Sequence, residues 1–386
     1  MSGVILRLDS ARWREHLRTV ADAVPGIVPV IKGNGYGYGL RRLAEESARL
    51  GVDVVGVGTA REVESVRAAF AGDIVILNPW DPSSTQAGEL ADDSRVISTV
   101  SRISDLERLA ARDQLPGGHP PWGGAGGSSP PESAQLRGGA EGSSPPESTR
   151  PRVLVELLTS MRRHGLRTDQ LGQVPALLEG VEFEGWTIHL PMQSEGRYAE
   201  AERLARAALE VAPGTLWLSH LPPEEAYGLA RQLGGAGADP VPVRLRIGTR
   251  LWLGEESSRQ TTATVLDVHP IRRGERAGYR QRICPADGWI LVLAGGTSHG
   301  IGMEAPTSAT TIRQRAIALA TGSLEAAGLA LSPYTVNGKK RWFLEPPHMQ
   351  SSLVFLPAKE QPPAIGEEVP VELRLTTAIV DDICEA

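Results

Sequence analysis

Short apolar runs rich in β-branched residues alternate with amphipathic segments along the first two thirds of the chain. Continuous apolar runs of this kind are typical of strands buried on both faces, as in parallel sheets. The predicted strands lie at residues 4–8, 28–32, 52–58, 73–77, 95–100, 152–158, 183–189, 215–219 and 243–248. The predicted helices lie at 12–20, 40–50, 60–69, near 104–111 and around 198–212. This many strand–helix units predict an α/β fold, a closed (β/α)8 TIM-like barrel.

The pattern changes beyond Gly254. Strand-like runs follow one another here with turns between them and few helical segments, at residues 261–268, 289–293, 351–356 and 368–375. We therefore predict two domains, a barrel domain over 1–254 and a mostly β domain over 255–386.

A stretch of low complexity interrupts the barrel pattern. Residues 115–150 consist almost entirely of Gly, Pro, Ser, Ala and Glu, and the run at 123–133 is nearly repeated at 138–148. Such a composition buries too little apolar surface to offset the entropy of ordering the chain. It predicts a disordered surface insertion rather than a domain, with a Pro-Pro ligand for a partner domain as the weaker alternative.

Charge and cysteine content exclude several functional classes. The chain has 40 Lys and Arg against 46 Asp and Glu, without a basic tract that would suit nucleic acid or a membrane surface. Its two cysteines, Cys284 and Cys384, have no motif spacing and predict neither disulfides nor a metal site. The first residues do not resemble a signal peptide, and no apolar run approaches membrane-spanning length. We expect a soluble cytoplasmic protein.

The candidate chemistry is concentrated in the stretch VPVIKGNGYGYG at residues 28–39. An apolar run ends at Lys32, and four glycines and two tyrosines follow within seven residues. A lysine that closes a buried strand is costly unless a partner or a covalent bond takes its amine. Desolvation also lowers the pKa of an amine and makes it nucleophilic. The alternative is a lysine that reaches water before a glycine-rich turn.

This stretch resembles the lysine motif of alanine racemases, which are barrel-type enzymes that use pyridoxal 5'-phosphate (PLP). Gly35 and Tyr38 depart from the family's alanine and histidine. The resemblance implies that Lys32 is the Schiff-base lysine, that PLP is the cofactor, and that residues 1–8 join the β domain. A racemase needs a base on each face of the cofactor, and Lys32 would be one of them.

The second base that the resemblance implies is Tyr279, supplied by the other subunit of a homodimer. Arg280 stands where the family has a glycine, and a surface tyrosine in a hairpin is the alternative. Met349 lies in a segment similar to one whose amide binds the substrate carboxylate, also across the dimer. The aldolase and dehydratase relatives hold a metal near the C-terminus, but His348 and Cys384 lack a ligand spacing.

A tyrosine has an ordinary pKa of about 10, so nearby cations must lower it before it acts as a base at neutral pH. By resemblance, Arg163 and His189 would do this and hold the substrate carboxylate. Arg246 would face the pyridine nitrogen and leave it largely unprotonated, because arginine does not readily accept a proton. Arg244, two residues earlier, is a competing candidate.

The resemblance assigns phosphate binding to a set of hydroxyls and backbone amides, those of Tyr36, Ser219, Gly248 and Thr249. Two departures suggest a wider or differently shaped substrate pocket: residues 293–300 lack the family's tyrosine, and Leu375-Thr376 replaces a Tyr-Arg pair. Glu156 stands where many members have a modified lysine, and we hypothesise that it orients Arg163.

The sequence therefore predicts an enzyme, a PLP-dependent racemase of the alanine-racemase type that forms a D-amino acid by a two-base Lys/Tyr mechanism. The alternatives are another PLP reaction on this scaffold (decarboxylase, aldolase or dehydratase) and a PLP-binding protein without catalysis. The amino-acid substrate and the role of the insertion stay open at this level.

Overall fold

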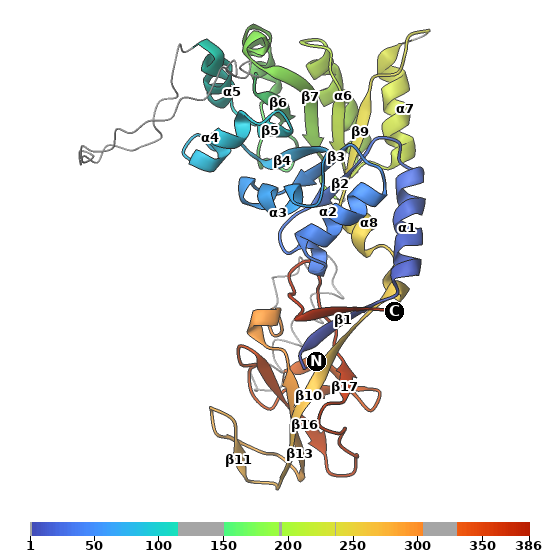
Figure 1. Cartoon of the computed structure of the whole chain (residues 1–386), viewed down its shortest axis with the longest axis vertical. Coiled ribbons are helices and arrows are strands. Elements are labelled where there is room, and N and C mark those ends of the chain that lie inside the picture. Colours follow the sequence, from blue (N-terminus) through green and yellow to red (C-terminus); the bar gives the residue numbers. More distant parts are fainter. Residues whose placement is uncertain (1, 115–149, 193–194, 236, 304–329) are drawn as a thin grey trace, which may run out of the picture. The chain divides into compact units, whose positions relative to one another are not determined.

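The computed structural model describes residues 2–114, 150–192, 195–235, 237–303 and 330–386 (Figure 1). The described residues divide into two compact units. The barrel unit comprises 19–33 and 40–251, and the unit that we call the β unit comprises 1–18, 34–39 and 252–386. The insertion predicted at 115–150 lies, except for its last residue, outside the described residues.

Eight parallel strands close into a barrel in sequence order, β2 to β9, with β9 pairing β2. The strands are β2 (Ile27–Ile31), β3 (Val54–Val57), β4 (Asp73–Pro79), β5 (Val96–Val100), β6 (Arg152–Leu157), β7 (Glu182–His189), β8 (Leu216–Ser219) and β9 (Val243–Ile247). Every residue of β2, β3, β5 and β8 is buried, as the continuous apolar runs require. The predicted TIM-like barrel is confirmed.

Helices connect the strands (Figure 1). They are α1 (Ser10–Asp22), α2 (Leu40–Arg49), α3 (Val63–Arg67), α4 (Thr85–Ala91), α5 (Ile103–Ala110), α6 (Arg197–Leu209), α7 (Pro223–Gly234) and α8 (Thr249–Leu253). The segment predicted as one helix at 60–69 is a 3-10 turn, η2 (Ala60–Glu62), followed by the short α3. None of the helices in the described part of the chain is long and apolar enough to cross a membrane.

The packing of the barrel interior determines which side chains face the candidate site. A buried cluster with one residue from each of six strands lies in its middle: Val28, Val54, Val75, Ile97, Leu154 and Trp217. Side chains two or four positions further along a strand point to the same side. Lys32, Ser101, Glu156 and Ser219 therefore follow the cluster on the inner side, at the carboxyl ends of their strands. In barrels of this kind that end is where active sites are built.

The β unit is built on an open sheet with the order β16-β13-β10-β1-β18, and β17 also pairs β10. Its strands are β1 (Val4–Leu8), β10 (Arg259–Ile271), β13 (Gly288–Ala294), β16 (Ser351–Pro357), β17 (Glu368–Pro370) and β18 (Asp382–Glu385). Two separate hairpins are β11 (Arg276–Ala277) with β12 (Arg282–Ile283), and β14 (Leu331–Val336) with β15 (Lys339–Trp342). The strand-rich region confirms the predicted mostly β character.

One predicted strand is too long. Residues 368–375 were expected to form a single strand, but β17 ends at Pro370. Val369 and Val371 are still buried in the core of the β unit. The alternating apolar pattern therefore predicts burial correctly, whereas the continuous strand ends at Pro370 and Val371 forms an isolated bridge with Tyr334.

The short segment 34–39 after Lys32 belongs to the β unit rather than to the barrel unit. It contains the turn η1 (Gly35–Gly37). The Asn34 side-chain amide donates to the carbonyl oxygens of Leu375 (2.8 Å) and Ala378 (2.5 Å). A side chain at Gly37 would meet Leu375 Cδ2 at 2.9 Å, so only glycine permits this approach.

Candidate active site

Lys32 follows β2 directly, at the carboxyl end of the barrel strands. Its neighbour on the next strand is Gly58, where an added Cβ would lie 3.2 Å from Lys32 Cβ. The Glu62 carboxylate accepts hydrogen bonds from the amides of Gly33 (3.1 Å) and Gly58 (2.6 Å). Glu62 thus ties the two strand ends together beside the lysine, a role that the sequence analysis missed.

The pKa of Lys32 is lowered from its ordinary value, first by partial burial of the amine and then by the positive charges of Arg163 and Arg246. Glu62 opposes this shift. The side chain nevertheless reaches solvent. More of the amine is therefore neutral, and able to act as a nucleophile or a base, than in a free lysine at the same pH.

Arg246 on β9 is buried, and its Nε and Nη2 atoms have no hydrogen-bond partner among the described residues. Burial lowers its pKa to about 10, so it stays charged at neutral pH. The competing candidate, Arg244, instead donates to Asp53 (2.9 and 2.6 Å) and lies over the Trp217 ring at 5.3 Å. Arg246 is thus the arginine with donors left for a ligand.

His189, the last residue of β7, has its pKa lowered to about 3 by burial and by the charges of Arg246 and Arg163. It is therefore uncharged at neutral pH, and its role beside Tyr279 and the substrate carboxylate stays a prediction from the resemblance. Its ring packs edge-on against His220, with 5.0 Å between centroids. His220, which has a left-handed φ of 64°, was missed, although it directly follows Ser219 at a strand end.

Glu156 on β6 is buried, and its carboxylate accepts a hydrogen bond from the Ser101 hydroxyl at 2.7 Å. No hydrogen bond or ion pair between described residues joins it to Arg163. Our hypothesis that Glu156 orients Arg163 directly is therefore not supported by the geometry. Its negative charge acts on Arg246 instead, where it opposes the lowering of the pKa by burial.

The residues expected to bind phosphate are divided between the two units. Ser219 is buried at the end of β8, next to His189 in the strand register. Gly248 and Thr249 follow β9, and α8 begins at Thr249. Tyr36 lies in the β unit, buried in η1 with a left-handed φ of 55°.

Tyr279 and Met349 both lie in the β unit and are 87% and 73% exposed. The Tyr279 ring packs on His348, with 4.7 Å between centroids, so the residue before Met349 contacts the tyrosine. The backbone amide of Tyr279 donates to the buried carboxylate of Glu345 at 3.0 Å. His348 Nε2 lies 2.7 Å from the same carboxylate.

Glu345 organises this second cluster, and the sequence analysis missed it. Burial alone would raise its pKa, but donors from Arg280, His348 and Tyr279 together lower it, so it is a carboxylate at neutral pH. Gly278 has a φ of 75°, and an added Cβ there would lie 2.2 Å from the Glu345 carboxyl carbon. Close approach to Glu345 therefore requires glycine before Tyr279.

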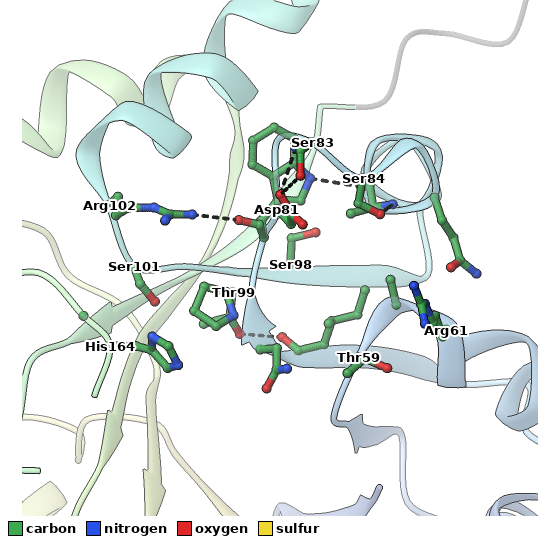
Figure 2. Close-up of a pocket in the computed structure, with 18 of the residues that line it drawn as sticks. Thr59, Arg61, Asp81, Ser83, Ser84, Ser98, Thr99, Ser101, Arg102 and His164 are labelled. Atoms are coloured by element: carbon green, nitrogen blue, oxygen red, sulfur yellow. Dashed lines mark hydrogen bonds between the residues drawn. The ribbon is translucent and has the colours of Figure 1, made fainter. Parts of the chain in front are cut away.

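A cavity of about 950 Å³ opens in the barrel unit beside Arg163 (Figure 2). Its walls come from the carboxyl ends of β3 to β6 and from α4, and Ser101 is one of its lining residues. No group of three or more His, Cys, Asp or Glu in the described ranges is arranged to hold a metal ion.

Comparisons with known proteins agree with this architecture. Residues 8–215 match the family model described as alanine racemase, N-terminal domain. The chain is 38% identical over 115 residues to alanine racemase of Nitratidesulfovibrio vulgaris (strain DP4) and 27% identical over 109 residues to that of Lawsonia intracellularis. These matches cover only 29% and 28% of the relatives' length.

Solved structures match over nearly the whole chain. Alanine racemase from E. faecalis superimposes with a TM-score of 0.66 at 17% identity, covering 100% of this chain and 98% of that one. Alanine racemase from Bartonella henselae, solved with covalently bound pyridoxal phosphate, gives a TM-score of 0.65 at 17% identity, covering 98% and 95%. At such identities the likeness establishes a common fold.

Proposed function

Because this chain belongs to the alanine racemase family, we propose that it is an isomerase, a PLP-dependent amino-acid racemase. The observation that carries the proposal is Lys32, which ends a barrel strand beside Arg163 and Arg246 and has a lowered pKa. A lysine with a partly neutral amine at a barrel mouth is suited to bind an aldehyde cofactor covalently.

The residues around Lys32 fit PLP. The buried donors of Arg246 that lack a partner among the described residues suit an acceptor such as the pyridine nitrogen. We assign the phosphate to Ser219, Gly248, Thr249 and Tyr36, as the sequence predicts. When bound, PLP withdraws electrons from the substrate and makes its α-proton acidic.

This chain's own residues would then hold and move the proton. We propose that Lys32 Nζ takes or returns the α-proton on one face of the substrate and that the Tyr279 hydroxyl does so on the other. Arg163 would bind the substrate carboxylate, and the Met349 amide would donate to it. His189, uncharged at neutral pH, would pack beside the site as a neutral hydrogen-bonding group.

Three further expectations belong to this proposal. We propose a homodimer in which each subunit supplies Tyr279 and Met349 to the other's barrel, and a D-amino acid as product. The cytoplasmic location and the domain division at residue 254 stay predictions from the sequence.

The experiment has two stages with the full-length protein. After incubation with PLP and borohydride reduction, peptide mass spectrometry should find the cofactor on Lys32. Deuterium incorporation at the α-carbon in D2O is then measured across a panel of L-amino acids, with chiral analysis of each product. Exchange with inversion supports a racemase, and loss of carboxylate as carbon dioxide points to a decarboxylase. PLP bound without any exchange would leave a non-catalytic binding protein.

A further inference from the structure

The cavity beside Arg163 is much larger than an alanine substrate requires. At about 950 Å³ it is at the upper end of the range for small-molecule sites, whereas the side chain of alanine is a single methyl group. A substrate that uses this space must carry a longer side chain.

The wall of the cavity is rich in hydroxyl groups. They belong to Thr59, Ser83, Ser84, Ser98, Thr99 and Ser101. Ser98 is 1% exposed, and its hydroxyl has no hydrogen-bond partner among the described residues. Buried hydroxyls are almost always hydrogen-bonded, so this wall favours a polar ligand over an apolar one.

Two other charged side chains, Arg102 and Asp81, also line the cavity. Arg102 donates to Asp105 at 2.6 Å. Asp81 accepts hydrogen bonds from the backbone amide (2.9 Å) and the hydroxyl (2.6 Å) of Ser83. Arg102 is thus paired with a carboxylate, whereas Asp81 keeps its negative charge, because the hydrogen bonds from Ser83 lower its pKa.

Arg61 and Arg163 are different. Both line the cavity, and no carboxylate in the described part of the chain forms an ion pair with either. Figure 2 shows Arg61 on one side of the cavity and His164, the chain neighbour of Arg163, on the opposite side, with Thr99 between them. Arg61 and Arg163 thus each add a guanidinium group to a wall that is otherwise rich in hydroxyl groups.

We propose that this cavity receives the side chain of the substrate and that the substrate is an acidic amino acid. Arg163 binds its α-carboxylate, and Arg61 binds its side-chain carboxylate. Guanidinium groups are suited to carboxylates because they donate two parallel hydrogen bonds. The reaction at the α-carbon rests on the proposed function, whereas binding of a dicarboxylate does not.

The test compares glutamate with glutamine, which is equal in size but uncharged in its side chain, and with the smaller alanine. α-Deuterium exchange by the PLP-loaded protein is measured for L-glutamate, L-glutamine and L-alanine, and calorimetry measures binding of glutarate, a dicarboxylate without an amine. The variant is Arg61→Gln. Its matched control is Arg108→Gln, because Arg108 is an exposed arginine on α5 outside the cavity.

We expect glutamate to exchange faster than glutamine and alanine in the unaltered protein and in the control. In Arg61→Gln, the ratio of glutamate to glutamine exchange and the affinity for glutarate should each fall about tenfold. Both results together support the proposal.

Exchange of alanine or glutamine as fast as glutamate, with glutarate affinity unchanged in Arg61→Gln, would overturn this inference and leave the racemase proposal intact. Arg61-dependent glutarate binding without exchange of any amino acid would support an acidic-ligand cavity and overturn the racemase proposal. The two failures are therefore distinguishable.

Discussion

The barrel cluster around Lys32 and the β-unit cluster around Tyr279 differ in how their carboxylates are hydrogen-bonded. In the barrel, Lys32, Arg163 and Arg246 lie near Glu62 and Glu156, yet these carboxylates bond to backbone amides and to a hydroxyl rather than to the cations. Burial, and then the mutual repulsion of the cations, lower the pKa of Lys32 and of Arg246.

In the β unit, one buried carboxylate accepts several hydrogen bonds. Glu345 accepts from the amides of Tyr279 and Arg280 and contacts His348, so its hydrogen-bonding capacity is used within the unit. The barrel cluster therefore leaves cations and hydrogen-bond donors available to a ligand. The β-unit cluster instead fixes the position of the exposed Tyr279. Four substitutions test this division.

The largest effect is expected from Lys32→Ala. It removes the amine that we propose both binds PLP and moves the α-proton, so α-deuterium exchange should fall at least about 10³-fold. Mass spectrometry after borohydride reduction should find no cofactor on the protein. Lys339→Ala, at an exposed lysine of β15, is the control. Full exchange in Lys32→Ala would place the chemistry elsewhere.

Tyr279→Phe should distinguish the role of the β-unit cluster in catalysis from the role of the barrel cluster in cofactor binding. Loss of one general base typically costs about 10²–10⁴-fold, so racemisation should fall by that factor while cofactor loading stays normal. Because Lys32 remains, one enantiomer should still exchange its α-proton without inversion. Tyr198→Phe, at a tyrosine that bonds Gln232 on the barrel surface, is the control. Unchanged racemisation would remove Tyr279 from the mechanism.

A smaller effect is expected from Glu345→Gln, which keeps the size of the side chain but replaces an acceptor oxygen with a donor NH2 group. The amides of Tyr279 and Arg280 and the His348 ring then lack enough acceptors, so Tyr279 is positioned less precisely. We expect kcat to fall about tenfold, with PLP loading of the barrel unchanged. A loss of cofactor loading instead would mean that Glu345 serves stability alone.

The smallest effect concerns His189. Its pKa is about 3 in the folded protein, below the ordinary 6.5, so the unfolded chain binds more protons between these values. The free energy of unfolding therefore decreases as the pH falls through this window. His189→Gln should lose less stability than the unaltered protein between pH 6.5 and 3, measured by urea unfolding. Parallel losses would show that His189 titrates normally.

The barrel was predictable because each of its strands has a recognisable local sequence pattern. β2, β3, β5 and β8 are buried throughout, so their β-branched residues form continuous runs that no helix period explains. The end of β17 was not predictable, because Val371 continues the apolar alternation beyond Pro370, where an isolated bridge to Tyr334 remains.

The supporting residues of the site were not predictable from local pattern. Glu345 bonds to Tyr279 across 66 residues, and Ser101 bonds to Glu156 across 55, with the low-complexity segment between them. Only the fold brings such pairs together. The charge of His189 likewise depends on burial and on the nearby Arg246, which the sequence order does not reveal.

The assignment of residues 34–39 to the β unit has a consequence for engineering and for evolution. Asn34 finds its acceptors on Leu375 and Ala378, so the loop that follows Lys32 is completed by residues near the other terminus. A chimera that exchanges everything after residue 251 for a foreign sequence would leave this loop without those acceptors. The two units are therefore not interchangeable modules, and any successful recombination must carry the loop and the C-terminal segment together.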